Sequence, residues 1–84
     1  MKTIFKYPIP ARRETFGIVL PINYKFIRVA FQKEQLFLWA EVKKESAMQA
    51  YNFGVFGTGH DIPANAKYLT TYDDGPFVFH IYEL

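Results

Sequence analysis

The chain has no cysteine among its 84 residues, which excludes disulfide bonds and thiolate chemistry. It also lacks any apolar run close to the roughly 20 residues that a helix needs to span a bilayer. We therefore expect a soluble protein without a membrane partner. The formal net charge is only +2, and so weak an excess does not favour a nucleic-acid partner.

Aromatic side chains are abundant instead. Half of the residues are hydrophobic, which excludes intrinsic disorder. The aromatic fraction is 19%, from nine Phe, six Tyr and one Trp. A chain of this length buries only about 60–65% of the surface that its unfolded state exposes, so it can build one modest core. We predict a single domain over residues 1–84.

Apolar positions recur with a period of two along most of the chain, which is typical of strands. The alternating runs cover residues 2–7, 15–20, 25–33, 36–43, 49–56, 66–72 and 77–83. Turn signals separate them, among them a polar connection at 11–14, a tight turn at Glu34-Gln35 and the run Asp73-Asp74-Gly75-Pro76. This spacing predicts an all-β fold, a small antiparallel sandwich or barrel of six to seven short strands.

Residues 41–51 are the one ambiguous stretch. Their good helix formers allow at most one short helix. A long hairpin connection between the strands at 36–43 and 49–56 is favoured, because alternation resumes at once.

The strand at 36–43 is apolar on both faces between Leu36 and Ala40. It is therefore a central strand, or a partner covers its second face. Together with the aromatic surplus, this predicts self-association as a dimer or a higher closed ring. Trp39 is a candidate contact residue for this reason.

Period two also predicts which side chains share a face. It groups Ile27 with Val29 and Phe31, Phe26 with Arg28, and Tyr68 with Thr70 and Tyr72. Phe37, Trp39 and Lys43 fall on one face as well. Aromatic rings beside cations can stack bases, so Arg28 and Trp39 are candidate binding residues, although core or interface packing is the favoured reading of these aromatics.

The longest irregular segment, residues 57–65, is the leading candidate for a functional loop. Gly57 and Gly59 permit positive φ, and successive backbone N–H groups in such a turn could cradle an anion. Thr58 and His60 add side-chain donors, and Asp61 could orient His60. The alternative is a structural turn in which the glycines serve only the backbone and His60 caps a carbonyl.

Catalytic and metal-binding patterns are weak. Ser46 is the only serine and has no nucleophile-elbow context. His60 and His80 stand 20 residues apart, which fits no metal-ligand spacing, and His80 lies within an apolar strand as a hydrogen-bonded, partly buried histidine would. We predict no enzyme activity, catalytic residue, metal or cofactor. A small enzyme that uses His60 as acid and base is the alternative.

Several short motifs together resemble a family of small proteins encoded by tailed bacteriophages. In chain order they are Phe5-Lys6-Tyr7-Pro8-Ile9-Pro10, Leu38-Trp39-Ala40, Phe56-Gly57-Thr58-Gly59-His60, Tyr68-Leu69-Thr70-Thr71-Tyr72 and Val78-Phe79-His80-Ile81-Tyr82-Glu83. The resemblance implies phage origin and a setting in the host-cell cytoplasm, and it implies no particular reaction.

Small phage proteins without catalytic groups commonly act by binding. We therefore predict that the protein acts by stoichiometric binding and inhibits a host protein in counter-defence or host takeover. One alternative is an oligomer that sequesters a phosphorylated or nucleotide signal molecule. A further alternative is a binder of single-stranded nucleic acid.

Overall fold

The computed structural model describes residues 1–10 and 14–84, and every regular element in this part of the chain is a strand. The seven strands are β1 (Lys2–Pro8), β2 (Thr15–Pro21), β3 (Lys25–Gln32), β4 (Gln35–Lys43), β5 (Met48–Gly57), β6 (Lys67–Asp74) and β7 (Phe77–Glu83). The predicted all-β fold is confirmed. Of the polar connection expected at 11–14, residues 11–13 lie outside the described residues.

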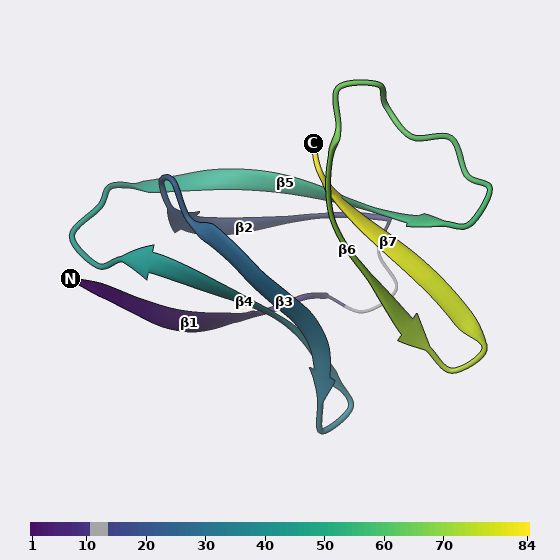
Figure 1. Ribbon diagram of the computed structural model, residues 1–84, viewed down its shortest axis with the longest axis horizontal. Coiled ribbons are helices and arrows are strands. Elements are labelled where there is room, and N and C mark those ends of the chain that lie inside the picture. Colours follow the sequence, from purple (N-terminus) through teal and green to yellow (C-terminus); the bar gives the residue numbers. More distant parts are fainter. Residues whose placement is uncertain (11–13) are drawn as a thin grey trace.

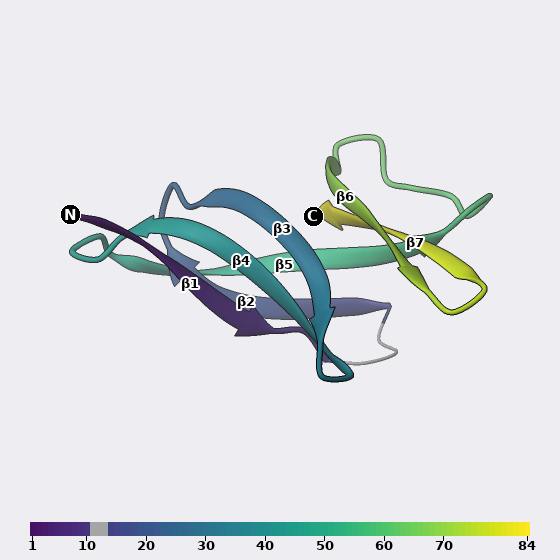
Figure 2. The same ribbon diagram turned by 60° about the horizontal axis from the view of Figure 1, so that its bottom comes forward.

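Two antiparallel sheets face each other as a sandwich (Figures 1 and 2). Sheet A has the order β1-β4-β3, and sheet B has the order β2-β5-β7-β6. The expected tight turn between β3 and β4 lies one residue earlier than predicted, because Gln32 pairs with Gln35. Lys33 and Glu34 form it with φ of 50° and 68°, the left-handed values of a two-residue hairpin turn.

Residues 44–47 form neither a helix nor a hairpin loop. The favoured hairpin between the strands at 36–43 and 49–56 is wrong, because β4 belongs to sheet A and β5 to sheet B. The segment crosses between the layers instead. Hydrogen bonds fix both ends of this segment. Lys44 N–H donates to the carbonyl of Met1, just before β1, at 3.2 Å, and the Ala47 carbonyl accepts from the N–H of Ile22, just after β2, at 2.8 Å.

The core lies between the sheets and follows the predicted alternation in β2 and β4. Phe16, Ile18 and Leu20 point inward from β2, and alternate residues from Leu36 to Val42 point inward from β4. Phe53 of β5 is the largest fully buried side chain. Its ring stacks on that of Phe16 with centroids 5.1 Å apart, so two neighbouring strands of sheet B are joined in the core.

Two bulges overturn the face assignments made from strict alternation. In β3 the register shifts between Phe26 and Arg28, so Phe26 lies opposite the buried Ala40 and Arg28 lies opposite Trp39 on the outer face. Phe26 and Arg28 therefore do not share a face. Ile27, the extra residue, is exposed instead of joining Val29 in the core, because a bulge puts two residues against one on the partner strand.

The second bulge lies in β6, between Tyr68 and Thr70. Tyr68 pairs with Tyr82 on the outer face of sheet B, whereas Thr70 pairs with the fully buried Ile81. The expectation that Tyr68, Thr70 and Tyr72 share one face is therefore wrong for Tyr68.

Each edge strand of the two sheets carries a feature that opposes further strand pairing. β1 ends in Pro8 and β2 in Pro21, and β3 and β6 carry the bulges. Contacts with another molecule should therefore use the faces or the open ends of the sandwich.

Tyr24, just before β3, ties the two layers together. Its hydroxyl donates a hydrogen bond to the Glu83 carboxylate of β7, and its ring meets that of Tyr51 edge-on at 4.9 Å. Burial raises the pKa of Tyr24 well above its usual range, and the Glu83 carboxylate raises it further. The neutral phenol is thus the form that the folded protein requires.

Replacing Phe53 by Ala should unfold the domain or bring it close to unfolding. A buried Phe→Ala change costs about 3–5 kcal/mol. A domain of this length has about 4–13 kcal/mol of stability at about 0.05–0.15 kcal/mol per residue. Urea denaturation checks this, and a loss below about 1 kcal/mol would show that Phe53 is not packed as described. Val19→Ala, at an exposed position of β2, is the control and should be near neutral.

The Tyr24–Glu83 bond predicts a loss of stability at alkaline pH. The folded-state pKa of Tyr24 is raised, so its contribution is complete below the unfolded value of about 10 and is lost as pH rises above it. Urea denaturation between about pH 8 and pH 11 should show this decline. Tyr24→Phe should lower stability at pH 8 by about 1–3 kcal/mol and flatten the decline; an unchanged slope would contradict the assignment.

Candidate functional site

An open cleft of about 940 Å³ lies at one end of the sandwich, between the layers. Its walls come from the residues after β1, the start of β2, the β3–β4 hairpin, the end of β5 with the following loop, and the β6–β7 hairpin. Sheet B has four strands against three in sheet A, and the β6–β7 hairpin extends to one side of sheet A in both views (Figures 1 and 2). The inner face of that hairpin is therefore only partly covered.

Four aromatic rings form a continuous row along this cleft. Phe31 of β3 meets Tyr72 edge-on at 6.1 Å, Tyr72 lies 5.7 Å from Phe79, and Phe79 lies 6.1 Å from Phe77. We call these four residues the aromatic row. Phe77 is 62% exposed and Phe31 44%, so both ends of the row reach solvent, whereas Tyr72 and Phe79 between them are half-buried.

Acidic residues from separate segments line the same cleft as the aromatic row. Glu34 comes from the β3–β4 turn, Asp61 from the loop after β5, and Asp74 from the end of β6. Burial raises the pKa of Tyr72, and the charge of Asp74 raises it further. Carboxylates thus line the cleft, and no Lys or Arg is among its described lining residues, which disfavours the phosphorylated ligand that the sequence left open.

The loop predicted to carry the site contributes three of its five candidate residues to the cleft. Gly57, His60 and Asp61 are among the residues that line it. Gly59 adopts the expected positive φ, at +91°. Thr58 belongs elsewhere, because its hydroxyl bonds to Nε2 of His80 at 3.1 Å.

His60 folds back onto its own turn. Its Nδ1 accepts a hydrogen bond from Gly57 N–H at 3.1 Å, and its backbone N–H donates to the Gly57 carbonyl at 3.1 Å. Two N–H groups that could have cradled an anion are therefore engaged within the turn. The ring caps a backbone N–H, where the sequence suggested a carbonyl.

His80 centres a polar network on the outer face of sheet B. Its Nδ1 lies 2.9 Å from the hydroxyl of Thr71, which in turn lies 2.8 Å from the hydroxyl of Tyr68. The hydrogen-bonded, half-buried His80 expected from its apolar strand is confirmed. Sequence reasoning missed its partners, because only the β6 bulge brings Tyr68 and Thr71 to one face.

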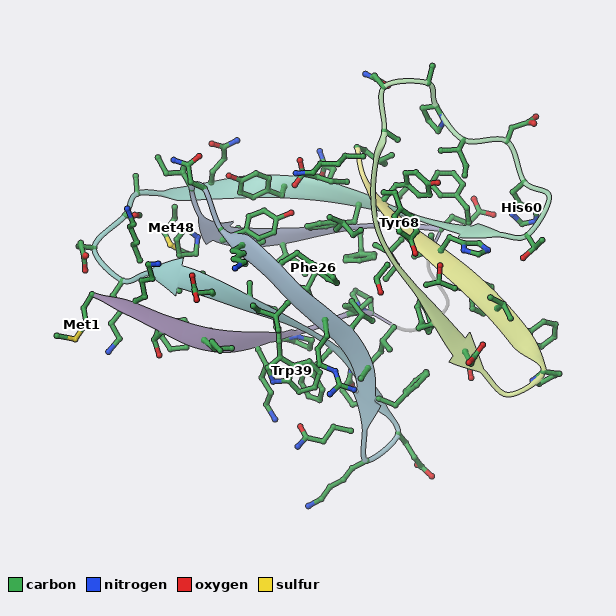
Figure 3. The ribbon with its side chains drawn as sticks, viewed as in Figure 1. Met1, Phe26, Trp39, Met48, His60 and Tyr68 are labelled. Carbon is green, nitrogen blue, oxygen red and sulfur yellow. The ribbon has the colours of Figure 1, made fainter. Side chains whose placement is uncertain are left out.

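Arg28 and Trp39 lie on a different surface, the outer face of sheet A. They pair directly across β3 and β4, and the Arg28 guanidinium lies 5.8 Å from the centre of the Trp39 ring. In Figure 3, Trp39 lies well away from His60. The predicted binding residues therefore form two separate groups.

The apolar second face of β4 is covered by side chains of the same chain. Lys6 places its ammonium 4.4 Å from the centre of the Phe37 ring, and Arg28 lies over Trp39. Such cation–π contacts shield the rings without a second subunit. Self-association stays a prediction, but this strand no longer requires it.

The whole chain, residues 1–84, matches the family described as a domain of unknown function, DUF7352, and belongs to that family. Neither a curated protein nor a solved structure matches the chain. Within residues 1–10 and 14–84, no three His, Asp or Glu side chains gather closely enough to hold a metal ion. The same residues include no helix long and apolar enough to span a membrane.

Substitutions in the 57–60 turn should separate backbone strain from side-chain function. Gly59→Val should lower stability by about 1–3 kcal/mol, because a β-branched residue is strained at φ +91°. A Cβ at this glycine meets nothing within 4 Å, so the loss reports φ and not a clash. His60→Ala removes only an exposed cap and should stay within about 1 kcal/mol in thermal unfolding. Equal losses from both changes would contradict this.

Proposed function

We propose that the protein works by stoichiometric binding of another protein, and that the cleft receives an apolar segment of that partner. The observation that carries the proposal is the aromatic row, which is half-buried in its middle and exposed at both ends along a cleft of about 940 Å³. Aromatic rings supply large contact areas at little cost in conformational entropy. They are typical anchors of protein interfaces.

Exposure of the aromatic row supports binding over a purely structural role. Phe77 is more exposed than any other Phe of the described part of the chain, at 62%, and it sits at the hairpin tip beside Gly75 and Pro76. A ring at that position adds little to the core. Removing it from water would favour association by the hydrophobic effect.

Charge defines the partner further. Glu34, Asp61 and Asp74 line the cleft from three separate segments of the chain. A segment with Lys or Arg beside an aromatic or aliphatic anchor would match both the apolar floor and the acidic rim. Because the edge strands carry prolines or bulges, this segment should bind through side chains and not by adding a strand.

The biological setting follows from the motif resemblance to phage-encoded proteins. In that setting the partner is a host protein in the cytoplasm, and binding inhibits it in counter-defence or host takeover. No chemical step is part of this proposal, so the complex should contain the partner unaltered.

A random peptide library panned against the purified protein tests the proposed chemistry. Selected peptides should combine an apolar anchor with basic residues. Synthetic versions should bind 1:1 by calorimetry and be recovered with unchanged mass. Phe77→Ala and Phe31→Ala should each weaken binding at least about fivefold, the effect of losing about 1 kcal/mol at an interface anchor.

Val19→Ala is the matched control, because Val19 is an exposed apolar residue on the outer face of sheet B. It should leave the affinity unchanged. Peptides that bind the Phe77 and Phe31 variants as tightly as the parent would exclude the cleft as the binding site. Cleavage or modification of the peptides would contradict stoichiometric binding.

A further inference from the structure

Cations are concentrated on one face of this protein. Of the eight Lys and Arg residues in the described part of the chain, five lie at outward positions of sheet A: Lys2, Lys6, Lys25, Arg28 and Lys43. The acidic residue at an outward position of these three strands is Glu41. The net charge of +2 conceals this segregation, because most carboxylates lie on other parts of the molecule.

The arrangement of these cations costs stability in the free protein. Lys2 lies directly opposite Lys43 in the β1–β4 pair, and like charges at such positions repel. Glu41 offsets part of the repulsion through an ion pair with Lys2, at 3.6 Å. A polyanion bound to this face would relieve the rest.

Two aromatic rings lie among the cations. Phe37 and Trp39 occupy successive outward positions of β4, with their ring centres 5.8 Å apart. Lys6 and Arg28, from the two flanking strands, lie over them. The face thus alternates positive charge with ring surface across all three strands of sheet A.

A depression of about 300 Å³ adjoins Phe37 at the end of this face. Lys6, Lys33, Gln32 and Gln35 complete its lining. The Lys6 ammonium donates to the Gln32 side-chain carbonyl at 2.7 Å, which holds the lysine over the ring. Cations and amides around one ring provide both a phosphate contact and hydrogen bonds to a base.

We propose that the outer face of sheet A binds single-stranded nucleic acid. Bases would stack on Trp39 and Phe37 while Lys6 and Arg28 move from the rings to neighbouring phosphates. Charge complementarity alone would also suit an acidic protein or an anionic membrane. The paired rings on an open sheet favour nucleic acid, because unpaired bases offer flat π-faces at successive positions.

This inference does not depend on the proposed function. The cleft is lined mainly from the inner side of the sandwich and by turns, whereas this face is the outer surface of sheet A. The two surfaces meet at Gln35, which lines both the cleft and the depression beside Phe37. Failure of the peptide experiment would leave it standing.

Trp39 is the only tryptophan of the chain, so its fluorescence reports directly on the face. Titration with single-stranded oligonucleotides of about eight nucleotides, within the usual site sizes of about 4–16, should quench this emission. Affinity should fall with salt with a log–log slope of about −0.7 for each phosphate neutralised. Four contacts would give a slope of about −3.

Variants separate stacking from charge. Trp39→Ala, followed by a fluorescein-labelled oligonucleotide, should weaken binding at least about fivefold, and Trp39→Phe should retain most of the affinity. Arg28→Ala should weaken binding and reduce the salt slope by about 0.7. Lys67→Ala is the control, because Lys67 is an exposed lysine of β6 in sheet B, and it should change neither quantity. Circular dichroism confirms that each variant is folded.

Two further titrations can overturn the proposal. Polyglutamate and vesicles of anionic phospholipid should bind more weakly than the oligonucleotide and leave the Trp39 emission unquenched. If either binds more tightly than the oligonucleotide, the face recognises an acidic protein or a membrane. If no oligonucleotide quenches Trp39 at low salt, or if quenching survives Arg28→Ala with an unchanged salt slope, the nucleic-acid site does not exist.

Discussion

Burial of Phe53 between the sheets is the constraint on which the other features depend. The ring is fully buried against Phe16, and it shares one core cluster with Leu38 and Ala40 of the facing sheet. Because side chains alternate along a strand, burying Leu38 and Ala40 forces Phe37 and Trp39 outward. The aromatic surface of sheet A is thus a direct consequence of how β4 contributes to the core.

The same requirement explains why the second face of β4 is chemically mixed. Two large rings on an outer face must be covered or bound, and here Lys6 and Arg28 extend over them. These cations keep the face hydrated, and their positive charge attracts anions. Acidic residues lie instead at the cleft, which they line together with the aromatic row. One small sandwich therefore presents two aromatic surfaces of opposite charge.

Strand positions could be predicted from the sequence because apolar residues alternate along the strands, and in β2 and β4 this alternation follows burial directly. The inward set of β2 and β4 was predictable residue by residue. The pairing of strands was not: nothing local distinguishes a hairpin at residues 44–47 from the crossing between sheets that the structure shows. The strands that pair with β4 and β5, which are distant in the sequence, decide between the hairpin and the crossing.

The bulges at Ile27 and Leu69 were also beyond prediction, because a single extra residue leaves no clear compositional signal and yet reverses every later side chain. They separate Arg28 from Phe26 and bring Tyr68 to the face of Thr71. For the candidate sites, the loop at 57–61 was found from its glycines and length. The cleft itself was missed, because Phe31 and Phe77 are distant in sequence. The concentration of cations on the outer face of sheet A was not predicted, because the net charge does not report where charges lie.

The central claim is that the cleft and the outer face of sheet A are separate binding surfaces of opposite preference. Amide chemical shifts of the labelled protein, followed in one sample with a basic aromatic peptide and then a single-stranded oligonucleotide, test it most directly. The account predicts that the peptide shifts Phe31, Tyr72 and Phe77, that the oligonucleotide shifts Lys6, Arg28 and Trp39, and that both bind together. Shifts of one common set of residues, or displacement of one ligand by the other, would contradict it.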